Sequence, residues 1–169
     1  METIRRQSAR LLVHGIVGGI IAGIVFAMAD MVMAVLVMGD SFFAPMRMIG
    51  AIVLGQAALN PGYSLLQAGG VGMALHMMLS ALYGVIFLFL LALGRQLWSS
   101  TSALLALGSV FGLALWVANF LVIAPPAFPW FGMANPFWMG FVAHTFFFGT
   151  VVGGYVAATR PGVSAATAS

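Results

Sequence analysis

Four long apolar segments, separated by stretches rich in polar residues, glycine or proline, dominate the hydrophobic pattern of this chain. They cover approximately residues 11–37, 71–93, 103–123 and 136–157. A helix rises about 1.5 Å per residue, so each segment is long enough to cross the roughly 30 Å hydrocarbon core of a bilayer. The pattern therefore predicts an all-α integral membrane protein, a four-helix transmembrane bundle.

A shorter apolar stretch lies between the first and second spans, in a region otherwise expected to be loop as far as Gly70. Pro45 suits the first turn of a helix, and the sequence Asn60-Pro61-Gly62 ends one, so a helix is expected over residues 45–59. This helix is too short to cross the bilayer. We expect it to be interfacial or re-entrant.

Prolines and small polar residues mark the remaining boundaries. Pro125, Pro126 and Pro129 are expected to prevent helix between the third and fourth spans, where aromatic residues indicate headgroup level. Pro136 then suits the first turn of the fourth span. The composition of residues 161–169 predicts a disordered tail.

Small residues recur at four-residue spacing along the spans, and Gly15, Gly19 and Gly23 form the first such row. Residues four apart lie on one helix face. Small side chains let helices approach closely in lipid, so we expect these faces to point into the bundle. The rows and pairs in the later spans are Gly72, His76, Ser80 and Gly84; Gly108 and Gly112; and Gly149 and Gly153.

The composition agrees with a membrane protein. Of the 169 residues, 63% are hydrophobic and 5% are charged, whereas soluble domains carry about 25% charged residues. The spans leave no room for a separate soluble domain, so residues 1–169 are expected to form a single transmembrane domain. The lack of cysteine excludes disulfides, thiolate metal sites and cysteine nucleophiles.

The charges predict an orientation. Six arginines outnumber three acidic residues, but they flank the spans, so we expect no nucleic-acid partner. With a cytoplasmic N-terminus, every arginine except Arg47 would lie on the cytoplasmic side, as the positive-inside rule favours. Both termini are therefore expected in the cytoplasm.

The first span also has features of a signal peptide, namely a basic start and the sequence Ala27-Met28-Ala29. However, the apolar run continues past Ala29 to Val37 without a polar region. We therefore expect the segment to be retained as a membrane helix.

Each span contributes one polar side chain to a layer in the expected outer half of the bilayer. Asp30, His76, Asn119 and His144 lie roughly 6 to 12 Å below the outer boundary at about 1.5 Å per residue. Ionisable groups in a bilayer are costly and usually mark sites, so these four are the candidate binding residues. His14 lies near the inner boundary and is expected to reach water or headgroups.

Four interpretations of this layer are open. The side chains can fix helix packing through hydrogen bonds worth about 1 kcal/mol or less each. His76 and His144 can be the axial ligands of a b-type haem in a four-helix bundle. The same histidines can be metal ligands, and every methionine after Met1 falls in the outer half, which suits copper. Finally, Asp30 and a histidine can form a proton-conducting or small-ligand site.

The sequence contains no enzyme motif. Walker, GxGxxG and GxSxG patterns are missing, and Ser80, one turn from His76, lacks the other parts of a triad. We expect a non-catalytic protein without a cofactor, acting as an accessory or structural subunit of a larger membrane complex. Its partners would be the lipid bilayer and other membrane proteins or further copies of itself.

Several features occur in order along the chain. They are a basic N-terminus, a glycine-rich first span, His76 with Ser80, Tyr83 and Gly84, a loop with Pro125, Pro126, Phe128, Pro129 and Trp130, and His144 with Gly149. This order resembles that of small four-span bacterial inner-membrane proteins of unknown function. The resemblance covers most of the chain and implies the four-span fold and an inner-membrane location, but no activity.

Overall fold

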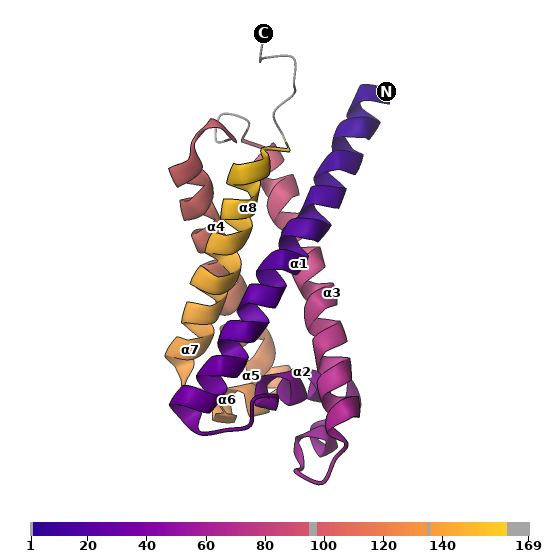
Figure 1. Cartoon of the computed structure of the whole chain (residues 1–169), viewed down its shortest axis with the longest axis vertical. Coiled ribbons are helices and arrows are strands. Elements are labelled where there is room, and N and C mark those ends of the chain that lie inside the picture. The colour runs from indigo at the N-terminus through magenta and orange to yellow at the C-terminus, as the bar shows by residue number, and fades with distance from the viewer. Residues whose placement is uncertain (1, 95–97, 135, 162–169) are drawn as a thin grey trace.

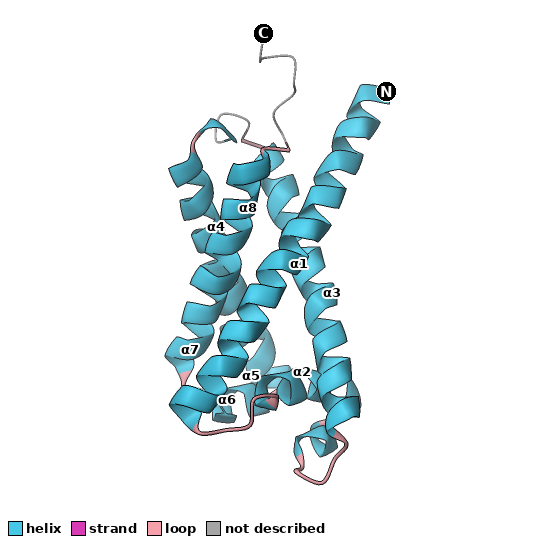
Figure 2. Ribbon diagram, in the orientation of Figure 1, coloured by secondary structure: helices cyan, strands magenta, loops and turns pink. Residues whose placement is uncertain are grey.

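The structure is a computed structural model that describes residues 2–94, 98–134 and 136–161. Throughout these ranges the chain forms helices and connecting loops, with no strand (Figure 2). Four helices are long and apolar enough to cross a membrane, namely Arg5–Met38, Leu65–Ala92, Thr101–Ala127 and Phe137–Thr159. The predicted all-α, four-span fold is confirmed, and the chain is described below as a multi-pass membrane protein.

The first two spans are single α-helices, α1 (Glu2–Met38) and α3 (Leu65–Ala92). The last two each contain a π-helical segment. The third span consists of α4 (Thr101–Trp116), the π-helix η3 (Val117–Ile123) and α5 (Ala124–Ala127). The fourth consists of α7 (Phe137–Val142), the π-helix η4 (Ala143–Thr150) and α8 (Val151–Thr159).

The helix expected over residues 45–59 is divided in two. The α-helix α2 (Ala44–Leu54) ends at Gly55, whose φ of 77° lies in the left-handed region that favours glycine. The short 3-10 helix η1 (Gln56–Leu59) follows. The Arg47 guanidinium donates hydrogen bonds to the carbonyl oxygens of Asn60 at 2.7 Å and Tyr63 at 2.9 Å, which ties the following loop to α2.

The second span begins at Leu65, six residues before the expected start at Val71. Ser64 is its N-cap, since the Ser64 hydroxyl oxygen accepts a hydrogen bond from the Gln67 backbone N–H at 3.4 Å. The expectation of loop up to Gly70 was therefore wrong. The helix begins at this serine cap although glycines follow within its first turns.

The expectation that prolines prevent helix after the third span was also wrong in part. Pro125 and Pro126 lie within α5, and α6 (Trp130–Ala134) begins directly after Pro129. Because the hydrogen-bonding pattern changes from π to α at Ala124, both prolines of α5 occupy the first turn of a new segment, where proline is tolerated.

The four spans form two closely packed pairs (Figure 1). One pair is α1 with α3, and the other is α4 with η4 and α8, while α1 joins the pairs through its contacts with η4 and α8. By contrast, among the described residues the α3 backbone makes few close approaches to α4 or η3. We call this boundary the α3/α4 seam.

Both pairs pack through small residues at matching positions. A Cβ atom placed on Gly19 of α1 would lie 2.2 Å from the carbonyl oxygen of Ser80 on α3. One placed on Gly108 of α4 would lie 2.2 Å from the carbonyl oxygen of Gly149 in η4. Since a real Cβ atom cannot come this close, only glycine fits, and the prediction that the small-residue faces point into the bundle is confirmed.

At the end of the bundle opposite α2, the Nδ1 atom of half-buried His14 shares a 2.9 Å hydrogen bond with the Tyr155 hydroxyl of α8, which links α1 to the last span. The expected contact of His14 with water or headgroups stays a prediction. The predicted disordered tail falls almost wholly on residues 162–169, which lie outside the described residues; Pro161 is buried.

Candidate functional site

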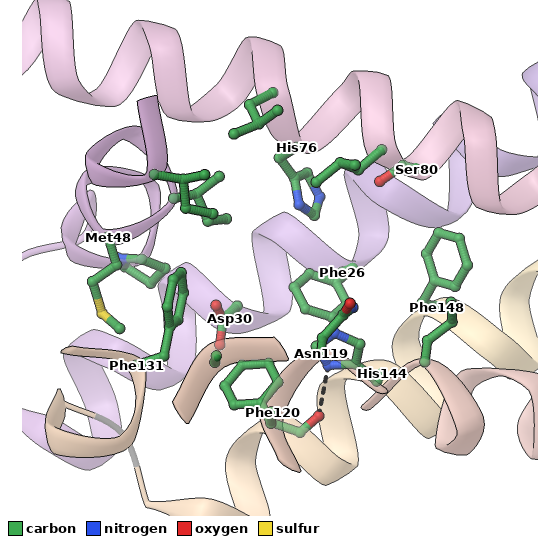
Figure 3. A pocket seen from close by; sticks show the side chains of 18 of the residues that line it. Phe26, Asp30, Met48, His76, Ser80, Asn119, Phe120, Phe131, His144 and Phe148 are labelled. Atoms are coloured by element: carbon green, nitrogen blue, oxygen red, sulfur yellow. Dashed lines mark hydrogen bonds between the residues drawn. The ribbon is translucent and has the colours of Figure 1, made fainter. Parts of the chain in front are cut away.

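A pocket of about 360 Å³ lies between the four spans, in the half of the bundle that contains α2 and α5. Its lining includes all four polar residues predicted from the sequence, one from each span (Figure 3). These are Asp30, His76, Asn119 and His144. The bundle thus brings the polar layer together around one cavity. The assignment of these residues as cofactor or metal ligands stays a prediction.

Asp30 brings a carboxylate to the pocket from α1. The residue is 9% exposed, and its side chain makes no hydrogen bond or ion pair with any other residue that the structure describes. A buried carboxylate in a membrane protein is normally paired. The first functional feature of the site is therefore the Asp30 carboxylate, which has no partner among the described residues.

His76 is held in a defined orientation by the backbone of α1. Its Nε2 atom lies 2.9 Å from the carbonyl oxygen of Gly23, and since a carbonyl only accepts, Nε2 is the donor. In the neutral ring, Nδ1 then carries a lone pair and no hydrogen. His76 is 8% exposed and offers an acceptor nitrogen at the pocket.

His144 is oriented in the same way by its own helix. Its Nδ1 atom donates to the carbonyl oxygen of Gly140 at 2.8 Å, the interaction drawn as a dashed line in Figure 3. The Nε2 atom of the neutral ring is therefore the acceptor. The two histidines use opposite ring nitrogens as donors, and each keeps one acceptor free.

The ring of Phe26 lies between the two imidazoles (Figure 3). Its centroid is 5.2 Å from that of His76 and 4.8 Å from that of His144. The ring of Phe120 also contacts His144, and the two ring centroids are 5.3 Å apart. The histidines are thus set in aromatic surroundings and are not in direct contact with each other.

Asn119 lies in η3 at the α3/α4 seam. Its Oδ1 atom accepts a 3.2 Å hydrogen bond from the Tyr83 hydroxyl of α3. Asn119 and His144 both lie in π-helical segments, which are frequent at functional sites. A change of backbone hydrogen bonding therefore accompanies the pocket in both the third and the fourth span.

At one end the pocket is lined by α2 and by the segment after the third span. Pro45, Met48, Ile49 and Ile52 of α2 line the cavity. The Trp130 indole nitrogen donates to the carbonyl oxygen of Met48 at 3.2 Å, which ties α6 to α2. The short apolar helix between the first two spans is thus a wall of the site.

The remaining lining is mostly apolar and aromatic. It comprises Leu75, Leu79, Ser80, Leu115, Ile123, Ala124, Phe128, Phe131 and Phe148, in addition to the residues above. Sequence reasoning did not assign Tyr83 or Phe26 to the site. Tyr83 follows His76 by seven residues, which is two helical turns. Its position on the same helix face as His76 could therefore have been predicted from the sequence.

The methionines are mostly packing residues. Met31 and Met46 are buried in one cluster with Ala27, and Met73 and Met77 pack against it. Met48 is the one methionine among the described lining residues. No group of three or more His, Cys, Asp or Glu side chains within the described ranges is arranged to hold a metal ion.

The chain shows no significant match to any known protein family, curated protein or solved structure with which it was compared.

Proposed function

We propose that this protein is a non-catalytic membrane protein that binds a small amphiphilic molecule in the pocket between its four spans. The observation that carries the proposal is the convergence of Asp30, His76, Asn119 and His144 on one cavity of about 360 Å³. Ligand sites typically have volumes of about 300 to 1,000 Å³, with apolar walls and a few convergent polar groups.

The unused polar groups of the site support binding over packing alone. A residue that only fixes helix register has its polar groups satisfied by the neighbouring helices. Here His76 and His144 are each anchored by one ring nitrogen to a backbone carbonyl, and Asp30 has no partner in the described chain. These groups are positioned for a molecule that the chain does not supply.

The same contacts favour a non-catalytic role. In a Ser-His-Asp arrangement, the histidine nitrogen that does not take the serine proton donates to a carboxylate. The Nε2 atom of His76 donates instead to the backbone carbonyl oxygen of Gly23, and Ser80 packs on α1 beside Gly19 and Gly23. Binding without covalent chemistry is the simpler function for this geometry.

The haem and copper alternatives are supported less well. Iron held by both histidines would require the Phe26 ring, which lies between them, to move away. A copper site would have one thioether, Met48, in the pocket lining. Both alternatives stay predictions, and metal analysis together with an absorption spectrum of the purified protein tests them.

The predicted role as an accessory subunit, the bacterial inner-membrane location and the cytoplasmic termini belong to the same proposal. A ligand-binding bundle with little mass outside the membrane suits a subunit that delivers or senses a membrane-soluble molecule. Co-purification in mild detergent tests this role. A protein that is always monomeric and without partners would count against it.

Two tryptophan substitutions on α3 test ligand binding itself. Leu79 lines the pocket, whereas Leu82 on the same helix is 51% exposed. Leu79→Trp should fill the cavity, and Leu82→Trp should leave it intact. The measurement is the thermal unfolding midpoint of the detergent-purified protein with small aromatic molecules that are cationic, neutral or anionic.

We expect at least one of these molecules to stabilise the wild type and Leu82→Trp but not Leu79→Trp. A ligand that binds only the folded state adds about 2.7 kcal/mol at a concentration of 100 times its Kd. A wild type that none of the molecules stabilises, or an equal shift in Leu79→Trp, would contradict the proposed function.

A further inference from the structure

The polar atoms that face the pocket are mainly hydrogen-bond acceptors. Asp30 offers two carboxylate oxygens, His76 offers Nδ1 and His144 offers Nε2, because the other nitrogen of each ring already donates to a backbone carbonyl. The Oδ1 atom of Asn119 is occupied by Tyr83, so this residue offers its amide N–H. The described lining contains no lysine or arginine.

The Asp30 carboxylate in this acceptor-rich site has no positively charged partner among the described residues. Removing an ionised carboxylate from water is costly, and a single buried carboxylate normally pairs with a cation. No described residue supplies one: Arg47 and Arg160 donate to backbone carbonyl oxygens, and Arg6 pairs with Glu2. A cationic group brought by a ligand would complete the pair.

The aromatic side chains fit the same charge. Phe26, Phe120, Phe128, Phe131 and Phe148 all line the pocket. The face of an aromatic ring attracts a cation through its quadrupole, most strongly where water is excluded. The rings therefore favour an ammonium group and also provide an apolar surface for the rest of the molecule.

We infer that the ligand is a protonated amine with a compact apolar or aromatic body. The ammonium group pairs with the Asp30 carboxylate and donates an N–H group to the free nitrogen of His76 or His144. Since the Phe26 ring lies between the two imidazoles, the other histidine contacts the rest of the molecule. The apolar body lies among the phenylalanines and against Ile49 and Ile52 of α2. This inference rests on the proposed function and adds the chemical class of the ligand to it.

Three molecules of similar shape and different charge show whether the pocket prefers a cationic, a neutral or an anionic ligand. Phenethylamine is a cation with N–H donors, phenethyl alcohol is neutral, and hydrocinnamate is an anion. Their binding to the full chain in lipid nanodiscs is measured by isothermal titration calorimetry. Empty nanodiscs provide the blank, since amines also partition into lipid.

We expect phenethylamine to bind at least about tenfold more tightly than either of the other two, as is typical of a charge-assisted contact. Binding of phenethyl alcohol or hydrocinnamate as tight as that of the amine would overturn the ligand class and leave the proposed function standing. No binding by any of the three would overturn both.

A matched pair of aspartate variants tests whether the preference for the amine depends on the charge of Asp30. Asp30→Asn keeps the size of the side chain and removes its charge, while Asp40→Asn does the same in the exposed loop after α1. Phenethylamine affinity should fall about tenfold or more in Asp30→Asn and stay unchanged in Asp40→Asn. Wild-type affinity in a folded Asp30→Asn protein would overturn the inference, and the wild-type comparison of the three molecules stands even where that variant does not fold.

Discussion

The Tyr83 hydroxyl lies 3.2 Å from Oδ1 of Asn119 and joins the two helix pairs directly across the α3/α4 seam. The backbones of α3 and η3 make few close approaches there, so side chains bridge the gap. Deeper along the same seam, the rings of Phe87 and Phe111 meet with their centroids 5.2 Å apart. The seam therefore has few backbone contacts, and the Tyr83 hydrogen bond crosses it at the level of the polar layer.

Removing the Tyr83 hydroxyl should weaken the contact between the two helix pairs, while the aromatic ring still fills the seam. In Tyr83→Phe we expect the free energy of unfolding to fall by about 1 kcal/mol or less, the usual worth of a hydrogen bond between membrane helices. A pocket ligand should also dissociate faster, because the seam opens more readily. Unfolding titrations in mixed micelles and stopped-flow dissociation measure the two effects.

Tyr63→Phe is the control for this change. Tyr63 lies in the loop before α3, and among the described contacts its hydroxyl makes no hydrogen bond. That variant should match the wild type in both measurements. An unchanged dissociation rate in Tyr83→Phe would show that the seam does not control release of the ligand.

Two glycines of α3 should respond oppositely to alanine. A Cβ atom on Gly84 would lie 2.2 Å from the carbonyl oxygen of Gly15 and 2.6 Å from the Cα atom of Gly19, so α1 and α3 would have to separate. We expect Gly84→Ala to destabilise the protein by about 1 to 3 kcal/mol. Gly70 has nothing within 4 Å of such a Cβ atom, and Gly70→Ala should be neutral or stabilising by up to about 1 kcal/mol.

The unfolding midpoints of both glycine variants, measured in the same detergent, check this prediction. A Gly84→Ala protein as stable as the wild type would mean that α1 and α3 are not in backbone contact. The proposed pocket would then lack one of its walls, because Asp30 and His76 are positioned by this helix pair.

The spans and the polar layer could be predicted because they depend on strong, local signals. A run of apolar residues longer than the bilayer thickness specifies a membrane helix. The four-residue spacing of glycines specifies which face packs, and residues at equal depth on such faces come together. Asp30 and His76 could therefore be assigned to one interior site before their contacts were known.

The remaining features depend on signals that hydrophobicity does not carry. A π-helix changes the hydrogen-bonding register by one residue without changing composition, so neither η3 nor η4 could be expected. The early start of α3 depends on a single cap, Ser64. The position of Phe26 between two histidines depends on the rotation of α1 against three neighbours.

The predicted orientation can be measured because the chain contains no cysteine. Single cysteines introduced by Asp40→Cys after α1 and Ser100→Cys before α4 lie in loops at opposite ends of the bundle. With cytoplasmic termini, a membrane-impermeant maleimide added to intact cells should label position 40 and leave position 100 unlabelled until the cells are lysed. The reverse pattern would invert the topology.

The histidines offer the most direct test of the shared pocket, because the protein has three of them and only two line the cavity. The measurement is a titration of the ¹⁵N-histidine-labelled protein with phenethylamine, followed by NMR and assigned with single His→Gln variants. We expect the Nδ1 signal of His76 and the Nε2 signal of His144 to shift with the same midpoint, while the signals of His14, hydrogen-bonded to Tyr155, stay in place. Shifts at only one of the two pocket histidines, at neither, or equally at His14 would contradict a single ligand site formed by all four spans.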